Sequence, residues 1–348
     1  MTQEQNSRPP RPRRTTIADV AAMAGVDRAV VSRLINNDPR LVIRDSTRQR
    51  VLKAIADLGY TPNVAARSLR TARAGTVGML IPDFANPAYA AIVKGAEVAA
   101  ASAGSMLLTG STEGAGKSAE NYLQLLGNGR VDGLLLAIGG HRVSDEESLA
   151  RLGFPWLFVN RTGAGHRRYV IQNDPGAVAL AVRHLVELGH TRLAHISGPR
   201  DNDSAQRRRR GYLKAIEAAG VAGQSDVILP GRYTPDGGAA AMERALRLPE
   251  PPTAVVVGNT ASAIGALHAA HRLGVSVPGD VSVVAIHDVP MAAHLVPPLT
   301  TVMMPLERLG ARAVELLFGR PADEDIREVV QEPVELIVRE STGPPRTA

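Results

Sequence analysis

The chain has 348 residues, 44% of them apolar, which is enough for two or three domains with hydrophobic cores. It contains no cysteine, so disulfide frameworks and thiolate metal sites are excluded. The sequence has no run of eighteen apolar residues, the length needed to span a membrane. Its proline- and arginine-rich N-terminus is unlike a signal peptide, so we expect a cytoplasmic protein. Aromatic residues make up only 3%, which argues against binding of single strands by stacked bases.

The excess positive charge is confined to the N-terminal fifth of the chain. Residues 1–73 hold 14 Lys and Arg against 6 Asp and Glu, a net charge of +8, whereas the other 275 residues hold 26 against 28. Cationic side chains near phosphates release condensed counterions, so this distribution favours binding to nucleic acid. Residues 1–14, where arginines alternate with prolines, are expected to form a disordered basic arm.

Two short helices that meet at a tight turn follow this arm. Thr16 can cap the first helix, with Asp19 in its first turn, and Gly25 supplies the turn. Asp27 can cap a second helix that runs to about Asn36. Apolar side chains at helical spacing would face inward, namely Ile17, Val20, Ala21, Ala24, Val30, Val31 and Leu34. The pattern predicts a helix-turn-helix, which commonly places its second helix in the DNA major groove.

The outward face of the second helix carries side chains that suit base edges and phosphates: Arg28, Ala29, Ser32, Arg33 and Asn36. An ordinary αα-hairpin would show a similar local pattern, so a further helix is needed to separate the two interpretations. We expect that helix at Thr47–Leu58, capped by Asp45 or Ser46 and ended by Gly59. Three short helices are the minimum core of a DNA-binding head.

From residue 76 onward, short apolar runs alternate with alanine-rich amphipathic helices. A first series of expected strands is Val77–Ile81, Met106–Thr109, Leu134–Ile138 and Trp156–Asn160. A second series is Arg192–Ser197, Val227–Leu229, Ala254–Gly258 and Val281–Ile286. Such alternation is typical of parallel sheets flanked by helices, and two series in tandem predict two similar lobes with a ligand cleft at the carboxyl ends of their strands.

No catalytic constellation emerges from the sequence. Gly114–Ser118 follows an apolar run, as a phosphate-binding loop would, but position 111 is a serine where the GxxxxGK[ST] spacing requires glycine. We therefore interpret that segment as a flexible surface turn. His268 and His271 lack a third candidate ligand, so we expect no metal site, no catalytic residue and no cofactor.

Several segments together resemble the lactose-repressor (LacI/GalR) family of bacterial transcription regulators. They run in the family's order as TIADVAAMAGVDRAVVSRLINN, GYTPNVAARSL, VGMLIPDFANPAY, HLVELGHTRLAHISGP, VPGDVSVVAIHD and PPLTTV. The resemblance extends from Thr16 to about Ser341. It implies an all-α helix-turn-helix head followed by an α/β, two-lobed, periplasmic-binding-protein-like core.

For DNA, the resemblance implies that Arg28 and Ala29 touch base edges while Ser32, Arg33 and Asn36 hold phosphates or neighbouring bases. Thr16, at the start of the head, is included in this contact set. The resemblance also implies a hinge helix, Val64–Arg70, that is ordered only on DNA. Asn63, Ala66 and Leu69 would contact DNA there, with Leu69 as an apolar wedge in the minor groove. The alternative is that Leu69 is only an apolar linker residue.

For the core, the resemblance implies a small polar effector, a sugar or a related metabolite, held between the lobes. Arg208 matches the family's ligand-binding arginine, whereas Arg207, Arg209 and Arg210 are expected to form a solvated or salt-bridged face. The effector-binding residues that it implies are Asn86, Tyr89, Asn160, Arg161, Ser204, Arg208, Asn259, His287 and Asp288.

The chain departs from the family pattern within this set. Thr260 and His287 stand where aspartates are frequent, and Ala88 stands where an aromatic ring is frequent, so no particular sugar is implied. Because histidine titrates near neutral pH, one hypothesis is that His287 makes effector binding depend on pH.

We therefore predict a homodimeric transcription regulator, a repressor in our interpretation, that binds a pseudo-palindromic operator in double-stranded DNA. The alternatives are an architectural DNA-binding protein and, less favoured, a nucleotide- or sugar-processing enzyme. The expected boundaries are 1–14 for the arm, 15–61 for the head, 62–74 for the hinge, 75–342 for the core and 343–348 for the tail. Within the core, 75–172 and 302–320 would form one lobe, and 173–299 and 328–342 the other.

Overall fold

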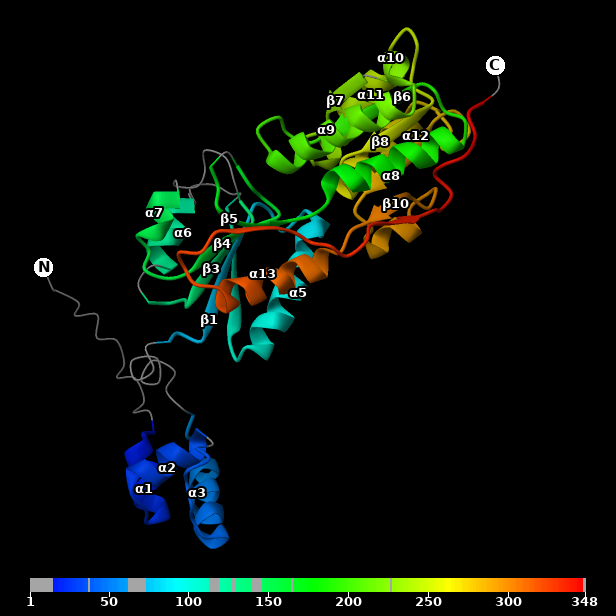
Figure 1. Ribbon diagram of the computed structural model, residues 1–348. Coiled ribbons are helices and arrows are strands. Elements are labelled where there is room, and N and C mark those ends of the chain that lie inside the picture. Colours follow the sequence, from blue (N-terminus) through cyan, green and yellow to red (C-terminus); the bar gives the residue numbers. More distant parts are fainter. Residues whose placement is uncertain are drawn as a thin grey trace, which may run out of the picture. The chain divides into compact units, whose positions relative to one another are not determined.

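The computed structural model describes residues 15–36, 38–61, 73–112, 119–126, 129–138, 146–163, 165–225 and 227–346. The chain divides into two compact units, Met1–Ala74 and Gly75–Ala348 (Figure 1). The expected basic arm, the expected hinge helix with Asn63, Ala66 and Leu69, and the glycine turn at 114–118 lie outside the described residues.

Three helices form the head: α1 (Ile17–Ala24), α2 (Arg28–Ile35) and α3 (Asp45–Asp57). They enclose a small core whose fully buried members are Val20, Val31 and Val51. All of the residues predicted to face inward belong to this core except Val30, which is half-buried, and a third helix closes the core. The helix-turn-helix prediction is confirmed.

The caps of the first two helices are those that the sequence indicates. Thr16 and Asp19 form a reciprocal capping box on α1, and the Asp27 side chain accepts a hydrogen bond from the backbone N–H of Ala29. Gly25 adopts φ +62°, a left-handed conformation that suits glycine. The third helix is present as predicted and ends before Gly59, but its predicted cap was wrong. Neither Asp45 nor Ser46 caps it, because the helix starts at Asp45 itself, after Arg44, which makes no side-chain cap.

The second unit contains two sheets, each of which defines a lobe. Lobe 1 has the strand order β11-β5-β4-β3-β1-β2, and all of its pairs are parallel. Its strands are β1 (Thr76–Ile81), β2 (Met106–Ser111), β3 (Gly133–Leu136), β4 (Trp156–Val159), β5 (Arg168–Ile171) and β11 (Ile326–Val329). Its helices are α5 (Pro87–Ser102), α6 (Ala119–Leu126), α7 (Glu146–Ala150) and α13 (Leu306–Gly319).

Lobe 2 has the strand order β12-β10-β9-β8-β6-β7, parallel except for the β10–β12 pair. Its strands are β6 (Leu193–Ser197), β7 (Val227–Pro230), β8 (Ala254–Val257), β9 (Ser282–Ile286), β10 (Thr300–Met303) and β12 (Glu335–Ile337). Its helices are α8 (Asp174–Glu187), α9 (Asp203–Ala218), α10 (Ala222–Ser225), α11 (Pro235–Leu246), α12 (Thr260–Arg272) and a 3₁₀ turn, Pro290–His294.

Each predicted strand exists, but the lobe boundaries near the C-terminus differ from those expected. β10 pairs with β9, so residues 302–303 belong to lobe 2 rather than lobe 1. β11 pairs with β5, so residues 328–329 belong to lobe 1 rather than lobe 2. The chain therefore passes between the lobes after β5, after β10 and after β11.

Glycines allow paired helices to approach closely on both lobes. α5 and α13 lie side by side (Figure 1), and a Cβ at Gly95 would collide with the backbone carbonyl oxygen of Glu307. On the other helix, a Cβ at Gly310 would collide with the carbonyl of Ile92. Gly238 and Gly265 have the same relation between α11 and α12. These contacts are between backbones, so no side-chain rotation could relieve them.

Replacing Gly95 by alanine should therefore lower the free energy of unfolding by about 1–3 kcal/mol, the usual cost of overpacking a core. Gly223→Ala is the matched control, because Gly223 is exposed and has open space around its Cα. Urea unfolding should place the midpoint of Gly95→Ala well below that of the wild type and leave that of Gly223→Ala unchanged or raised. Equal midpoints for the two variants would contradict the close-packed crossing.

Candidate functional sites

The first candidate site is the outward face of α2. Arg28, Ala29, Arg33 and Asn36 are exposed, and Ser32 is half-buried. Within the described residues, neither the Arg28 nor the Arg33 guanidinium has a hydrogen bond or an ion pair. The face therefore presents two cations without an ion pair on a helix whose opposite side, Val31 and Leu34, is buried in the head. Arg33 is close enough to Asp38 for its charge to contribute to lowering the pKa of that carboxyl. Thr16 is exposed and is engaged in the α1 cap.

The second candidate site lies where the segment after β4 meets the start of α9. Arg161 donates from Nη2 to the Tyr89 hydroxyl at 2.9 Å and from Nε to the Ala137 carbonyl at 3.3 Å, both in lobe 1. Its Nη1 reaches across to Ser204 Oγ of lobe 2 at 3.4 Å and lies 3.8 Å from Asp203. The backbone N–H of Thr162 also donates to Asp203, at 3.0 Å. Polar contacts thus join the lobes at this point.

A buried ion group stands directly behind these contacts. Asp174, the first residue of α8, is fully buried and accepts hydrogen bonds from Arg208 Nε at 2.7 Å and from Arg207 Nη2 at 2.7 Å. Arg207 also pairs with Asp203. Burial alone would raise the pKa of Asp174, but the charges and hydrogen bonds of the two arginines outweigh it and lower that pKa. Asp174 is therefore ionised at neutral pH.

His287 completes the group on the side of β9. Arg208 donates from Nη2 to His287 Nε2 at 2.8 Å and from Nη1 to the Gly258 carbonyl. A guanidinium can only donate, so Nε2 is the unprotonated nitrogen and Nδ1 carries the proton. Burial first, and then the charge of Arg208, lower the pKa of His287 well below its usual value. The premise of a pH-sensitive His287 is thus wrong: the ring is neutral at and above neutral pH.

Several buried polar atoms near this group have no partner among the described residues. They include Asn160 Oδ1, both side-chain polar atoms of Gln172, His287 Nδ1, and the hydroxyl of Tyr233, over whose ring the guanidinium of Arg208 lies. Asn160 also has φ +58°, unusual for a residue with a side chain, directly before Arg161. Buried polar groups are normally paired, so these atoms lack the hydrogen bonds that their burial normally requires.

The remaining expected effector residues have structural bonds of their own. Asn86 caps α5, and Asn259 caps α12 while its Nδ2 donates to the Tyr233 carbonyl at 3.2 Å. The Asp288 carboxylate accepts from Thr301 Oγ1 at 2.6 Å and pairs with Arg339 at 2.8 Å. Among the described residues, the Asp288 carboxylate thus belongs to a separate ion pair and has no hydrogen bond to Arg208 or to the His287 ring.

Sequence reasoning missed Asp174, Asp203 and Gln172. Asp174 and Asp203 each open a helix, where an acidic residue is expected for the helix dipole alone, so no local signal marks them as partners of arginine. Of the arginine run, Arg209 and Arg210 are exposed as expected, but Arg207 is buried and forms ion pairs.

Two further observations concern the described part of the chain. No group of three or more histidine or acidic side chains gathers there in a way that could hold a metal ion. None of the described helices combines the length and apolar character needed to cross a membrane.

A helix-turn-helix head followed by two α/β lobes that meet at a polar site defines a DNA-binding transcription regulator. Comparison with known proteins gives the family. Residues 16–63 match the model of "Bacterial regulatory proteins, lacI family", and residues 182–342 match that of a periplasmic binding protein-like domain. The chain belongs to the lacI family.

Individual relatives cover almost the whole chain. The transcriptional repressor PurR of Mannheimia succiniciproducens is 33% identical over 94% of this chain and 98% of its own length. The ribose operon repressor of Escherichia coli K12 is 34% identical over 88% of this chain and 92% of its own. The crystal structure of the Lac repressor dimer, bound to operator and the anti-inducer ONPF, matches with a TM-score of 0.81 and 27% identity, covering 95% of this chain and 100% of that one.

The buried ion group predicts a large cost for removing its carboxylate. Asp174→Ala leaves two buried arginines short of a countercharge, and we expect a loss of about 3–5 kcal/mol in unfolding free energy. Asp236→Ala is the control, since Asp236 also lies in the first turn of a helix but is exposed. Urea unfolding of both variants measures the difference, and a loss at Asp174 as small as that at Asp236 would contradict the assignment.

The neutral form of His287 can be observed directly. In ¹⁵N-edited NMR spectra of histidine-labelled protein, we expect the His287 ring to keep the Nδ1–H tautomer between pH 5.5 and 8. The pKa of His287 in the folded protein is lowered, so the ring should become protonated only at more acidic pH. The signal that disappears in His287→Gln identifies the His287 resonance. A His287 signal that titrates near pH 6.5 would contradict the burial and the Arg208 contact.

Proposed function

We propose that this regulator binds a pseudo-palindromic operator as a homodimer and represses transcription. The exposed and unpaired Arg28 and Arg33 on α2 carry this proposal. Arginine reads guanine edges and phosphates by donating from a planar fork, and it is most available when no protein carboxylate competes. One small head offers few base contacts, so two heads related by twofold symmetry fit a symmetric site. The dimer on operator in the Lac repressor structure supports this arrangement.

Within the head, we assign base contacts to Arg28 and Ala29 and backbone contacts to Thr16, Ser32, Arg33 and Asn36. The small side chain of Ala29 can contact only a thymine methyl group, or it can leave room for a neighbouring side chain to reach the bases. For the hinge we keep the assignment of Asn63, Ala66 and Leu69 to DNA, with Leu69 as the minor-groove wedge.

We further propose that a small polar effector, a sugar or a related metabolite, binds between the lobes without any cofactor. Asn160, Gln172 and His287 supply buried polar atoms that still need partners, which supports a ligand rich in hydroxyl groups. His287 would donate a hydrogen bond from Nδ1 to the effector. The same site would be lined by Arg161, Ser204 and Arg208. Tyr89, Asn86 and Asn259 support its walls, and Asp288 is the weakest member because its carboxylate is already paired.

The control step would act on the polar contacts between the lobes. Arg161 and Thr162 of lobe 1 bind Ser204 and Asp203 of lobe 2, and an effector that replaced or strengthened these bonds would change the preferred lobe arrangement. Coupling between effector and operator affinity of about 1–3 kcal/mol is the usual magnitude.

Selection of random duplex DNA by the full-length protein at physiological salt tests the proposal. A regulator should enrich a twofold symmetric site and prefer it over random duplexes by roughly a thousandfold or more. Equal binding to every duplex would indicate an architectural DNA-binding protein instead. Turnover of a nucleotide or a glycoside by the pure protein would revive the enzyme alternative.

Variants of α2 then separate the roles on the selected site. Arg28→Ala should weaken specific binding by about 1–3 kcal/mol and relax the preference at one position of each half-site. Arg33→Ala should weaken binding to all sequences and reduce the salt dependence by about one counterion. Lys53→Ala on α3 is the control, since it removes an equal charge from another helix of the head. If all three variants lost affinity equally and without a change in preference, the assignment of the α2 face would be wrong.

A further inference from the structure

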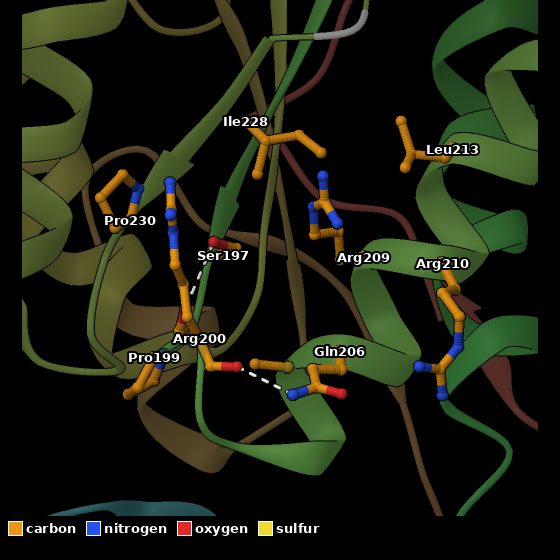
Figure 2. A pocket seen from close by; sticks show the side chains of 11 residues that line it. Ser197, Pro199, Arg200, Gln206, Arg209, Arg210, Leu213, Ile228 and Pro230 are labelled. Carbon is orange, nitrogen blue, oxygen red and sulfur yellow. Dashed lines mark hydrogen bonds between the residues drawn. The ribbon is translucent and has the colours of Figure 1, made fainter.

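Lobe 2 has a cavity of about 830 Å³ that is separate from the buried ion group. It lies between α9 and the edge strand β7, beside the turn that follows β6 (Figure 2). Arg207 and Arg208 occupy the buried side of α9, whereas Arg209 and Arg210 line this cavity on its other side. The same helix therefore contributes to two sites with different arginines.

The charged lining of the cavity is entirely cationic. Arg200, Arg209 and Arg210 line it, and no carboxylate does so among the described residues. Within the described part of the chain these three guanidiniums have no hydrogen bond and no ion pair. Arg320 on lobe 1, which is also exposed, differs because it pairs with Glu324 at 2.9 Å. A cationic lining of this kind favours an anion, and Figure 2 shows Arg200 and Arg209 as the two that extend beside residues of β7.

The rest of the lining suits an organic group next to an anion. Leu213 and Ile228 are half-buried and offer apolar surface from facing elements. Figure 2 shows Arg209 extending between these two side chains, while Arg200 extends beside Pro230. Gln206 donates from Nε2 to the Arg200 carbonyl at 2.9 Å, which ties the turn to the helix and leaves the amide oxygen free as an acceptor.

We propose that this cavity binds a small organic phosphate. Guanidinium groups hold phosphate oxygens through paired, charge-assisted hydrogen bonds, and Arg200 and Arg209 come from separate elements that can approach one group from two directions. The volume is that of a metabolite site, and Leu213 and Ile228 would cover the organic part. The site is distinct from the proposed effector site, because its ligand would contact neither Arg208 nor Ser204.

Titration calorimetry of the full-length protein with glucose 6-phosphate, with inorganic phosphate as competitor, tests this site. The probe should bind saturably to the wild type, and inorganic phosphate should displace it. In the double variant R209Q/R210Q, and in the single variant R200Q, the affinity should fall by roughly tenfold or more, because each lost guanidinium removes a charge-assisted bond.

The variant R244Q/R247Q is the matched control, since it removes two arginines from the exposed side of α11 and its end. It should bind the probe as the wild type does. Binding of equal strength in all variants would place the phosphate elsewhere, for instance on the basic head or in the effector site, and would overturn this proposal alone. Absence of saturable binding would also overturn it, as would displacement by a glutamate-rich peptide but not by phosphate, which would indicate an acidic protein partner.

Discussion

One buried carboxylate, Asp174, organises the side of lobe 2 that faces lobe 1. It is the third residue after β5, where the chain first passes between the lobes, and it holds Arg207 and Arg208 of α9 through short hydrogen bonds. Without it, two guanidinium charges would be buried with too little compensation, a cost that few folds of this size could bear. Arg208 is thereby fixed against His287 and the Gly258 carbonyl, and Arg207 fixes Asp203, which in turn accepts from Thr162 of lobe 1. One polar contact between the lobes, from Thr162 to Asp203, is thus linked to this ionised group through Arg207.

This arrangement explains how a helix with consecutive arginines can be both part of a core and part of a surface. Successive residues of an α-helix are about 100° apart, so four adjacent arginines cannot share one environment. Arg207 and Arg208 face α8 and its carboxylate, while Arg209 and Arg210 face the gap toward β7. The charges of Arg207 and Arg208 are compensated by Asp174, whereas Arg209 and Arg210 have no ion pair among the described residues.

Local features of the fold could be predicted, and features that depend on distant residues could not. The bounds of α1 and α2 could be predicted from Thr16, Gly25 and Asp27, because caps and turns are determined by a few adjacent residues. The start of α3 was misplaced because Asp45 serves equally well as a cap or as a first-turn residue. Four strands were missed: β5, β10, β11 and β12. β11 and β12 are short and partly exposed, so neither shows a continuous apolar run. β5 and β10 are mostly buried but have only four residues each and begin with polar residues. The pairing of Asp174 with Arg208 spans 34 positions, and no periodic pattern in the sequence indicates it. Likewise, no local signal shows that Asp288, which we assigned to the effector site, is bound by Arg339, far along the chain.

The repeated passage of the chain between the lobes has a consequence for synthesis on the ribosome. α13 packs against α5 through Gly95 and Gly310, and β11 forms the edge of the lobe 1 sheet beside β5. Both elements are translated after nearly all of lobe 2. The first lobe to begin is therefore unfinished when most of the second has emerged, and its apolar α5 face stays uncovered until Leu306–Gly319 leaves the exit tunnel. A nascent chain of this protein would therefore need protection from aggregation for longer at lobe 1 than at lobe 2, although synthesis of lobe 1 begins first.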